Sequence, residues 1–250
     1  MIAANTDGAD TIRSSHITFD QWEVYNGDDS ISVKANSTNI KIKNSVFHDG
    51  LGVAIGSIGQ YFGEVETVEG LLVENIHFDN CLHAAYVKTW TADQNGYPPN
   101  GGGGGVGCKC PRVDTRNEMT SDADFERLDT KDVAFRNLTA DHMRGSAVAI
   151  SQCTRFIGAP GDGNCTNSEF HVRDITMDGL TGTTVSPNIA SLQCSAVKPC
   201  DEINLTNIDL KFENGTSTKS YLCGNVKEPG GFECTGKACE GGSSTGECKS

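Results

Sequence analysis

The stretch Leu71-Leu72-Val73-Glu74-Asn75 contains the pattern that decides the fold of this chain. Two apolar residues flank one other residue, and a polar side chain follows two positions after the second apolar residue. This pattern begins at Ile17, Ile40, Leu71, Val133, Phe170 and Ile203, with Gln21, Asn44, Asn75, Asn137, Asp174 and Asn207 at the polar position. Alternation of period two is typical of a strand with one buried face, and an Asn that returns once per turn can bond to its neighbours.

Successive units begin 23, 31, 62, 37 and 33 residues apart. Such spacing indicates the coils of a solenoid with inserted loops, and the interval of 62 residues predicts an additional coil. Segments such as Val53–Ile55 and Ala85–Lys88 supply further strands, about three per coil. The sequence therefore predicts an all-β, right-handed parallel β-helix. A β-propeller is disfavoured because tight Asn-Gly or Asp-Gly hairpins do not recur at regular spacing.

We expect residues 1–250 to form a single β-helix domain. The chain enters its first motif close to Met1, so we expect it to lack a signal peptide and the N-terminal coils of the solenoid. Residues 97–130 hold a Gly-rich run and an aperiodic charged stretch, which predicts a long loop insertion or a retained intron.

Eleven cysteines, mostly in the C-terminal half, indicate local disulfides. The closely spaced pairs are Cys153 and Cys165, Cys194 and Cys200, Cys223 and Cys234, and Cys239 and Cys248, so residues 223–250 form a disulfide-stapled tail. Five Asn-x-Ser/Thr sequons also favour an extracellular, secreted glycoprotein. The cysteines lack the spacing and His partners that zinc requires, so we expect no metal and no cofactor.

The formal net charge of -13 argues against nucleic acid as a partner, because phosphate binding requires a basic surface. No apolar run approaches 18 residues, so we expect no membrane span. The charge also repels acidic polysaccharides unless Lys or Arg residues lie locally in the binding site. We expect a monomer that acts on a polysaccharide.

Three aspartates near the start form the candidate active site: Asp7 in Asn5-Thr6-Asp7-Gly8, then Asp28 and Asp29 in Asn26-Gly27-Asp28-Asp29. They lie about one repeat apart, so neighbouring coils about 4.8 Å apart bring them together. In glycoside hydrolysis one carboxylic acid protonates the leaving oxygen while an ionised partner activates water, and a separation of roughly 6.5–9.5 Å gives inversion. The alternative is that these residues only form turns.

The motifs Asn5-Thr6-Asp7-Gly8, Gly27-Asp28-Asp29, Gly50-Leu51-Gly52 and Tyr86-Val87-Lys88 occur in an order that resembles glycoside hydrolase family 28. This family contains the fungal polygalacturonases and rhamnogalacturonan hydrolases that degrade pectin. The resemblance extends from Asn5 to Cys234 and implies a right-handed parallel β-helix with an open groove. It implies that Asp28 is the general acid and that Asp7 and Asp29 activate water. Lys88, Tyr86 and Asn5 are the expected substrate-binding residues.

Two residues depart from the polygalacturonase pattern. Leu51 stands where those enzymes have His, and Tyr86 stands where they have Arg. Tyr cannot replace the bidentate grip of Arg on a carboxylate, which favours a rhamnogalacturonan or exo-galacturonan substrate, with Tyr86 stacking on a sugar. His48 and His83 are candidates to replace the missing histidine, and Cys81 has no obvious disulfide partner.

Two other functions compete with this interpretation. A calcium-dependent pectate lyase shares the β-helix and uses acidic residues to hold Ca²⁺. A non-catalytic carbohydrate-binding β-helix, or an inactive fragment, is consistent with the changes at Leu51 and Tyr86.

Overall fold

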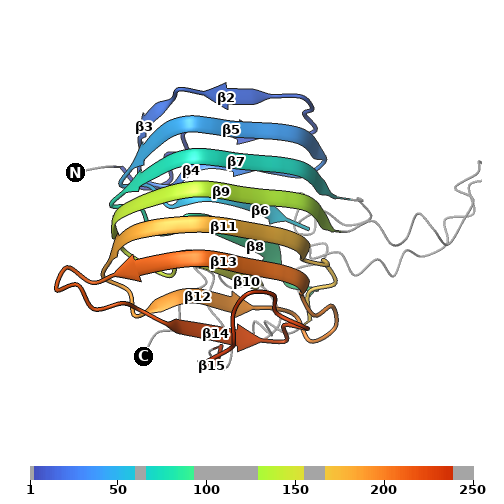
Figure 1. Ribbon diagram of the computed structural model, residues 1–250. Coiled ribbons are helices and arrows are strands. Elements are labelled where there is room, and N and C mark those ends of the chain that lie inside the picture. The colour runs from blue at the N-terminus through green and yellow to red at the C-terminus, as the bar shows by residue number, and fades with distance from the viewer. Residues whose placement is uncertain (1–2, 60–65, 93–128, 155–166, 239–250) are drawn as a thin grey trace, which may run out of the picture.

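The computed structural model describes residues 3–59, 66–92, 129–154 and 167–238. These residues contain strands and turns but no α-helix. The expected insertion at 97–130 lies outside them except for its last two residues, and Thr130 already begins a strand. The chain coils into a stack of strands that runs from β2 at one end to β14 and β15 at the other (Figure 1).

Two parallel sheets form the walls of the stack. The first has the order β1-β4-β6-β8-β10-β12-β14-β15. Its strands are β1 (Asp10–Thr11), β4 (Asp29–Val33), β6 (Gly52–Ile58), β8 (Ala85–Trp90), β10 (Val148–Thr154), β12 (Asn188–Gln193), β14 (Ser220–Gly224) and β15 (Gly236–Lys237). The second has the order β13-β11-β9-β7-β5-β2, with β3 also paired to β5. Its strands are β2 (Thr18–Asp20), β3 (Glu23–Tyr25), β5 (Ser37–His48), β7 (Val68–Asp79), β9 (Thr130–Met143), β11 (Arg173–Thr184) and β13 (Asp201–Lys211).

The strands of the second sheet bend at a column of residues in the left-handed backbone region. Its members are Gln21, Asn44, Asn75, Asn137, Gly179 and Asn207, with φ values of 61°, 52°, 56°, 50°, 86° and 54°. Asn tolerates this region better than most residues, because its short side chain bonds locally, and Gly has no Cβ to clash. The recurring Asn of the sequence pattern is therefore confirmed as a corner residue at Asn44, Asn75, Asn137 and Asn207.

The column is also a ladder of side-chain amides. Asn75 Nδ2 donates to Asn44 Oδ1 at 3.0 Å, and Asn137 Nδ2 donates to Asn75 Oδ1 at 2.6 Å. Asn44 Nδ2 ends this ladder on Asp20 Oδ1 at 2.8 Å. The coils that contain β2, β5, β7 and β9 thus bond to one another through side chains as well as through the backbone.

Two details of the predicted repeat are wrong. β7 pairs directly with β9, with Leu71 opposite Val133, so the interval of 62 residues contains an insertion and no additional coil between them. The fifth unit is Ile175–Met177 with Gly179 at the corner, because Ile175 pairs with both Val133 and Ile203. Asp174 has a positive φ of 53° as well, but belongs to a second left-handed column beside Asp132.

Apolar side chains from both sheets fill the interior. In the second sheet, Ile42, Val73, Phe135, Met177 and Leu205 follow one another in register, each at most 1% exposed. Val33, Ile55, Val87 and Ile150 form the facing column in the first sheet and are also buried. Because side chains alternate along a strand, the neighbours of this second column point to the outer face of the first sheet.

Two of the predicted disulfides are present, Cys194–Cys200 and Cys223–Cys234. Cys153 is also disulfide-bonded, whereas Cys165, Cys239 and Cys248 lie outside the described residues. Cys81 is a free, buried cysteine, in agreement with its missing partner in the sequence. Burial raises the pKa of the Cys81 thiol to about 12, so it stays protonated.

The amide ladder predicts which of two substitutions at Asn75 destabilises the protein more. Asn75→Ala removes two amide hydrogen bonds and places a Cβ-bearing, non-bonding residue at a positive φ, so we expect it to lower the free energy of unfolding by about 2 kcal/mol. Asn75→Gly removes the same bonds without the backbone strain and should lose about half as much. Urea midpoints of the two variants measure the difference. Equal losses would show that the left-handed corner contributes nothing.

Candidate active site

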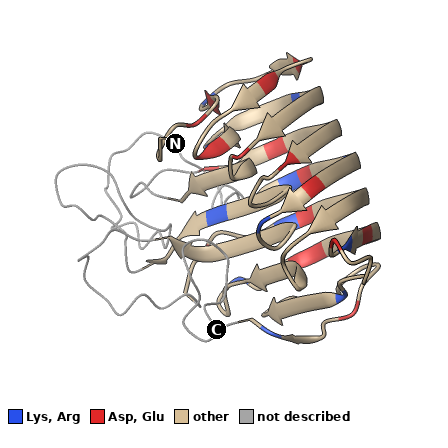
Figure 2. Cartoon of the chain, turned by 90° about the vertical axis from the view of Figure 1, so that its left-hand side faces the viewer, with Lys and Arg blue, Asp and Glu red and all other residues tan. Residues whose placement is uncertain are grey.

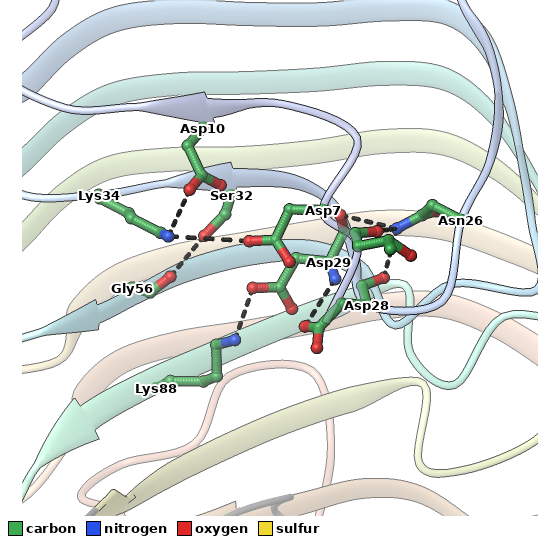
Figure 3. A network of polar contacts seen from close by, with 10 residues as sticks. Asp7, Asp10, Asn26, Asp28, Asp29, Ser32, Lys34, Gly56 and Lys88 are labelled. Carbon is green, nitrogen blue, oxygen red and sulfur yellow. Dashed lines mark hydrogen bonds and ion pairs between the residues drawn. The ribbon is translucent and has the colours of Figure 1, made fainter. Parts of the chain in front are cut away.

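Asp7, Asp28 and Asp29 come together on neighbouring coils, as the sequence predicts (Figure 3). Asp7 lies in the segment before β1, and Asp28 and Asp29 lie where β4 begins. One carboxylate oxygen from each residue lies within 4.8 Å of the other two. Asp7 is exposed, Asp28 is half-buried and Asp29 is only 1% exposed.

Asn26 holds the two coils of the site together. Its Nδ2 lies 3.0 Å from the Thr6 carbonyl oxygen on one coil, and 2.7 Å and 2.9 Å from the carbonyl oxygens of Asp28 and Asp29 on the other. The Asn26 side chain is buried, so these bonds exclude water from the turn. The Gly8 N–H also donates to the Asp29 carbonyl at 2.9 Å. The carboxylates are therefore positioned by backbone contacts independent of their own charges.

Gly50, the first glycine of the Gly50-Leu51-Gly52 motif, has no room for a side chain, because the coil that carries Asn26 and Ser30 lies very close to it. A Cβ on Gly50 would lie 2.5 Å from Asn26 Oδ1 and 2.6 Å from Ser30 Oγ. The Leu51 N–H that follows donates to the Asp28 carbonyl at 2.7 Å. Arg144 fixes this turn from outside, where its Nη2 donates to the Gly50 carbonyl at 3.0 Å. The motif around Leu51 thus supports the Asp28 turn through its backbone.

Lys88 forms a more buried ion pair at the site than Lys34 does. Its Nζ lies 2.5 Å from Asp29 Oδ2, although β6 separates β4 from β8. The side chain can span this distance because β6 presents Ala54 and Gly56 to the outer face. Burial raises the pKa of Asp29, while Lys88 acts in the opposite direction by favouring the carboxylate. Asp29 Oδ1 is buried and accepts no hydrogen bond from the described residues.

A second lysine of the site, Lys34 in the segment after β4, lies next to Asp7. Lys34 Nζ lies 3.7 Å from Asp7 Oδ2 and 2.5 Å from Asp10 Oδ2. Burial raises the pKa of Asp7 to about 6, and the nearby carboxylates of Asp29, Asp10 and Asp28 add to the rise. The cluster therefore holds a proton on Asp7 in weakly acidic solution. Above that pH Asp7 is a stronger base than an ordinary aspartate.

The spacing of the carboxylates does not decide between inversion and retention. One oxygen of each lies within 4.8 Å of the others, whereas the roughly 6.5–9.5 Å typical of inverting enzymes is measured between whole carboxyl groups. Asp28 and Asp29 are adjacent in the chain, and Asp7 turns toward them from the next coil. The distance does not by itself support inversion.

Three carboxylates at this spacing are also a set of oxygen ligands that a divalent cation accepts. However, the Lys88 ammonium already neutralises Asp29 at 2.5 Å and would repel a cation bound there. Ca²⁺ requires six to eight oxygens, and the triad supplies few of them. The residues present fit a water-activating acid cluster better than a calcium site.

The predicted substrate-binding residues differ in their placement. Tyr86 is on the same face as Lys88, with its ring centroid 5.2 Å from Lys88 Nζ, but it is only 3% exposed. So little of the Tyr86 side chain is exposed that the structure does not support the expectation that its ring stacks on a sugar. Asn5 is exposed, in the left-handed region with φ 55°, two residues before Asp7.

Neither candidate histidine contacts the three carboxylates in the described part of the chain. His83 is fully buried, with Nδ1 2.6 Å from the Ser146 carbonyl and its ring beside Tyr86. His48 Nδ1 lies 2.9 Å from Asp79 Oδ2, and its ring stacks on Tyr25 at 4.0 Å. Both histidines have structural partners, so the histidine missing at Leu51 is not replaced by either.

Sequence reasoning missed Asn26, Lys34 and Arg144. Asn26 directly precedes Gly27-Asp28-Asp29, and its place in that motif was the available signal. Lys34 lies five residues after Asp29, where strand alternation puts it on the same face as Ser32. No local signal marks Arg144, because it reaches the turn from a coil 94 residues away.

Comparison with known proteins agrees with this architecture. The family model of glycosyl hydrolases family 28 matches residues 2–96 and 129–239, so the chain belongs to this family of right-handed parallel β-helix proteins. It is similar to alpha-L-rhamnosidase rgxB of Aspergillus niger, with 51% identity over 98% of this chain and 52% of the relative. An exopolygalacturonase of Cochliobolus carbonum is 32% identical over 97% of the chain and 50% of that protein.

A solved structure shares the fold. The endo-xylogalacturonan hydrolase from Aspergillus tubingensis matches with a TM-score of 0.69 and 25% identity, covering 94% of this chain and 54% of that one. The chain thus spans about half the length of the relatives it matches. Among the described residues, no helix is long and apolar enough to cross a membrane.

The raised pKa of Asp7 predicts a pH-dependent stability. The unfolded chain releases this proton near the ordinary value of 3.8, whereas the folded chain releases it at about 6. Between these values the folded state binds more protons, so its stability falls as the pH rises from about 4 to 6. Asp7→Asn removes this loss. We expect the variant to be more stable at pH 7 by about 1 kcal/mol, a value reduced for solvent screening, and unchanged at pH 3.5.

Thermal melts at the two pH values measure this effect. Asp20→Asn is the matched control, because the hydrogen bond from Asn44 and then the contact with Lys43 lower the pKa of Asp20. That stabilisation is present above the ordinary pKa and lost in acid, so Asp20→Asn should lower the Tm at pH 7. A Tm of Asp7→Asn that does not exceed wild type at pH 7 would contradict the account.

Proposed function

We propose that this chain carries the acid-base centre of a glycoside hydrolase that cleaves α-linked sugars of pectin. The observation that carries the proposal is the convergence of Asp7, Asp28 and Asp29 within 4.8 Å, in a chain of glycosyl hydrolase family 28. Asp28 is the general acid, and Asp7 and Asp29 activate water. The pectic polysaccharide is the partner that this chemistry requires.

This division of roles follows the family resemblance, and the environment of Asp7 suits water activation above about pH 6. Asp29 is buried beside Lys88, which favours its ionised form, and its Oδ1 accepts no hydrogen bond from the described residues. Asp7 is a stronger base than an ordinary aspartate, because its pKa is raised to about 6. Asp28 is half-buried and only partly engaged, with Oδ1 2.9 Å from the Asp29 N–H. Its second oxygen can reach a leaving group.

The substrate we propose is an exposed chain end of rhamnogalacturonan or galacturonan. Alpha-L-rhamnosidase rgxB is the more similar relative at 51% identity, and the exopolygalacturonase is 32% identical. Leu51 and Tyr86 replace the histidine and arginine of polygalacturonases, which disfavours internal cleavage of plain polygalacturonate. We place the terminal rhamnoside first.

We also propose that the protein works outside the cell, as a monomer. The disulfides Cys194–Cys200 and Cys223–Cys234 support an oxidising compartment, since such bonds rarely persist in the cytosol. The net charge of -13 suits a protein that stays dispersed in solution.

Loss of the general acid should abolish hydrolysis. We expect Asp28→Asn to lower kcat/KM by a factor of about 10² to 10⁴, because protonation of the leaving oxygen is lost. Reducing-sugar release and product identity, on rhamnogalacturonan and galacturonan oligosaccharides, measure this with the full-length protein. Asp20→Asn, on the opposite sheet, is the control. Equal rates for Asp28→Asn and wild type would overturn the proposal in favour of a non-catalytic carbohydrate-binding protein.

The anomeric form of the first product tests the water-activating role. Because Asp29 is 1% exposed, its carboxylate oxygens have little access to the sugar carbon for direct attack. We expect inversion, which proton NMR detects as a product of opposite anomeric configuration before mutarotation. A product of retained configuration would show that a carboxylate acts as the nucleophile.

A calcium-dependent lyase is the second candidate, since the three carboxylates form a set of oxygen ligands. Activity that survives a chelator and gives no unsaturated product would exclude it. Chelator-sensitive formation of an unsaturated product would replace the hydrolase proposal.

A further inference from the structure

Lys34 is a cation at the candidate active site that the proposed reaction does not use. Val33, Ile55 and Val87 are in register on β4, β6 and β8, so the residues that follow them, Lys34, Gly56 and Lys88, lie along one row. Gly56 lies between the two lysines in this row, and Figure 3 shows Lys34 directed at Asp7 and Lys88 directed at Asp29. The outer face of the first sheet thus places one cation beside each of these two carboxylates.

The two lysines differ in what binds them. Lys88 Nζ is bonded to the buried carboxylate of Asp29, and its side chain is 17% exposed. Lys34 Nζ bonds to Asp10, whose side chain is 39% exposed, and the Lys34 side chain is itself 29% exposed. An ion pair at the surface contributes little to stability and exchanges readily. Lys34 is thus the cation of this site that an external anion can reach.

The surroundings of Lys34 favour a carboxylate as the bound anion. The ammonium already lies near two carboxylates, Asp10 at 2.5 Å and Asp7 at 3.7 Å. In the free protein the Asp10 carboxylate occupies a position on Lys34 that a substrate carboxylate can take. Figure 2 shows that Asp and Glu recur on many coils, so an acidic sugar requires a local cation to bind here.

We propose that Lys34 binds the carboxylate of a uronic acid residue next to the scissile bond, displacing Asp10. The inference rests on the proposed function, because it places the uronate beside the catalytic carboxylates. It gives the site a requirement for an acidic sugar adjacent to the bond that is cleaved, whether the sugar removed is neutral or acidic. It also assigns to Lys34 the substrate-binding role that was expected of Lys88.

Equilibrium binding tests the inference independently of hydrolysis. The background is Asp28→Asn, which prevents turnover, and the probes are rhamnogalacturonan and galacturonan oligosaccharides as free acids and as their methyl esters. Adding Lys34→Met should weaken binding of the free acid by about tenfold, since a charge-assisted hydrogen bond is lost. Binding of the methyl ester should not change. Lys34→Arg keeps the charge and should retain most of the affinity.

Two matched variants separate binding from a structural role. Asp10→Asn removes the competing carboxylate, so we expect tighter binding of the free acid by a few fold. Lys43→Met breaks a comparable ion pair, with Asp20 at 3.2 Å on the second sheet, and should leave binding unchanged. Equal losses for acid and ester in Lys34→Met, weaker acid binding in Asp10→Asn, or binding of neither probe would overturn the inference.

The same variants distinguish the two proposals. If wild type and Asp28→Asn both fail to hydrolyse either probe but Lys34→Met selectively loses the free acid, the catalytic proposal fails and the binding inference stands. If Asp28→Asn is inactive and Lys34→Met binds both probes like its parent, hydrolysis stands and the Lys34 inference fails.

Discussion

The ion pair between Lys88 and the buried carboxylate of Asp29 is the interaction on which the site depends. A carboxylate that is 1% exposed stays charged only if a cation or several hydrogen bonds compensate for the lost water. Lys88 supplies that charge from two strands away, at 2.5 Å. The pair places an ionised oxygen at a fixed point beside Asp7 and Asp28. It also withdraws Lys88 from solvent, which leaves Lys34 as the more accessible cation.

Most of the fold could be predicted because its local requirements repeat. A left-handed corner in each coil selects Asn or Gly, and the alternating apolar residues before it select a buried strand face. The error at the fifth unit has a physical cause. Gly179 satisfies the corner without an amide, while Asp174, in a neighbouring left-handed column, offers a polar residue at the expected spacing. The additional coil in the long interval was wrong because spacing alone cannot separate an insertion from a coil.

The three aspartates of the candidate site could be predicted from the sequence, but the residues that surround them could not. Asp7, Asp28 and Asp29 are marked by Asp-Gly and Asp-Asp motifs that recur one coil apart, whereas Asn26, Lys34 and Arg144 act through contacts between coils. The sequence also did not show which side chains of the site are exposed to solvent. Tyr86 was expected to face a sugar, but its neighbours cover it, and the short distance between the carboxylates depends on how the turns orient. Local patterns thus mark the candidate acids, and the stacking of coils decides their environment.

The central claim is that Lys88 forms a stabilising ion pair with Asp29, and a double-mutant cycle tests it most directly. Urea unfolding of wild type, Asp29→Asn, Lys88→Met and the double variant at pH 7 gives the coupling energy between the two side chains. We predict a coupling of about 2 kcal/mol or more, with Lys88→Met the least stable protein because it leaves a buried carboxylate unpaired. Additive effects of the two substitutions would show that Lys88 is not held by Asp29 and would contradict the account of the site.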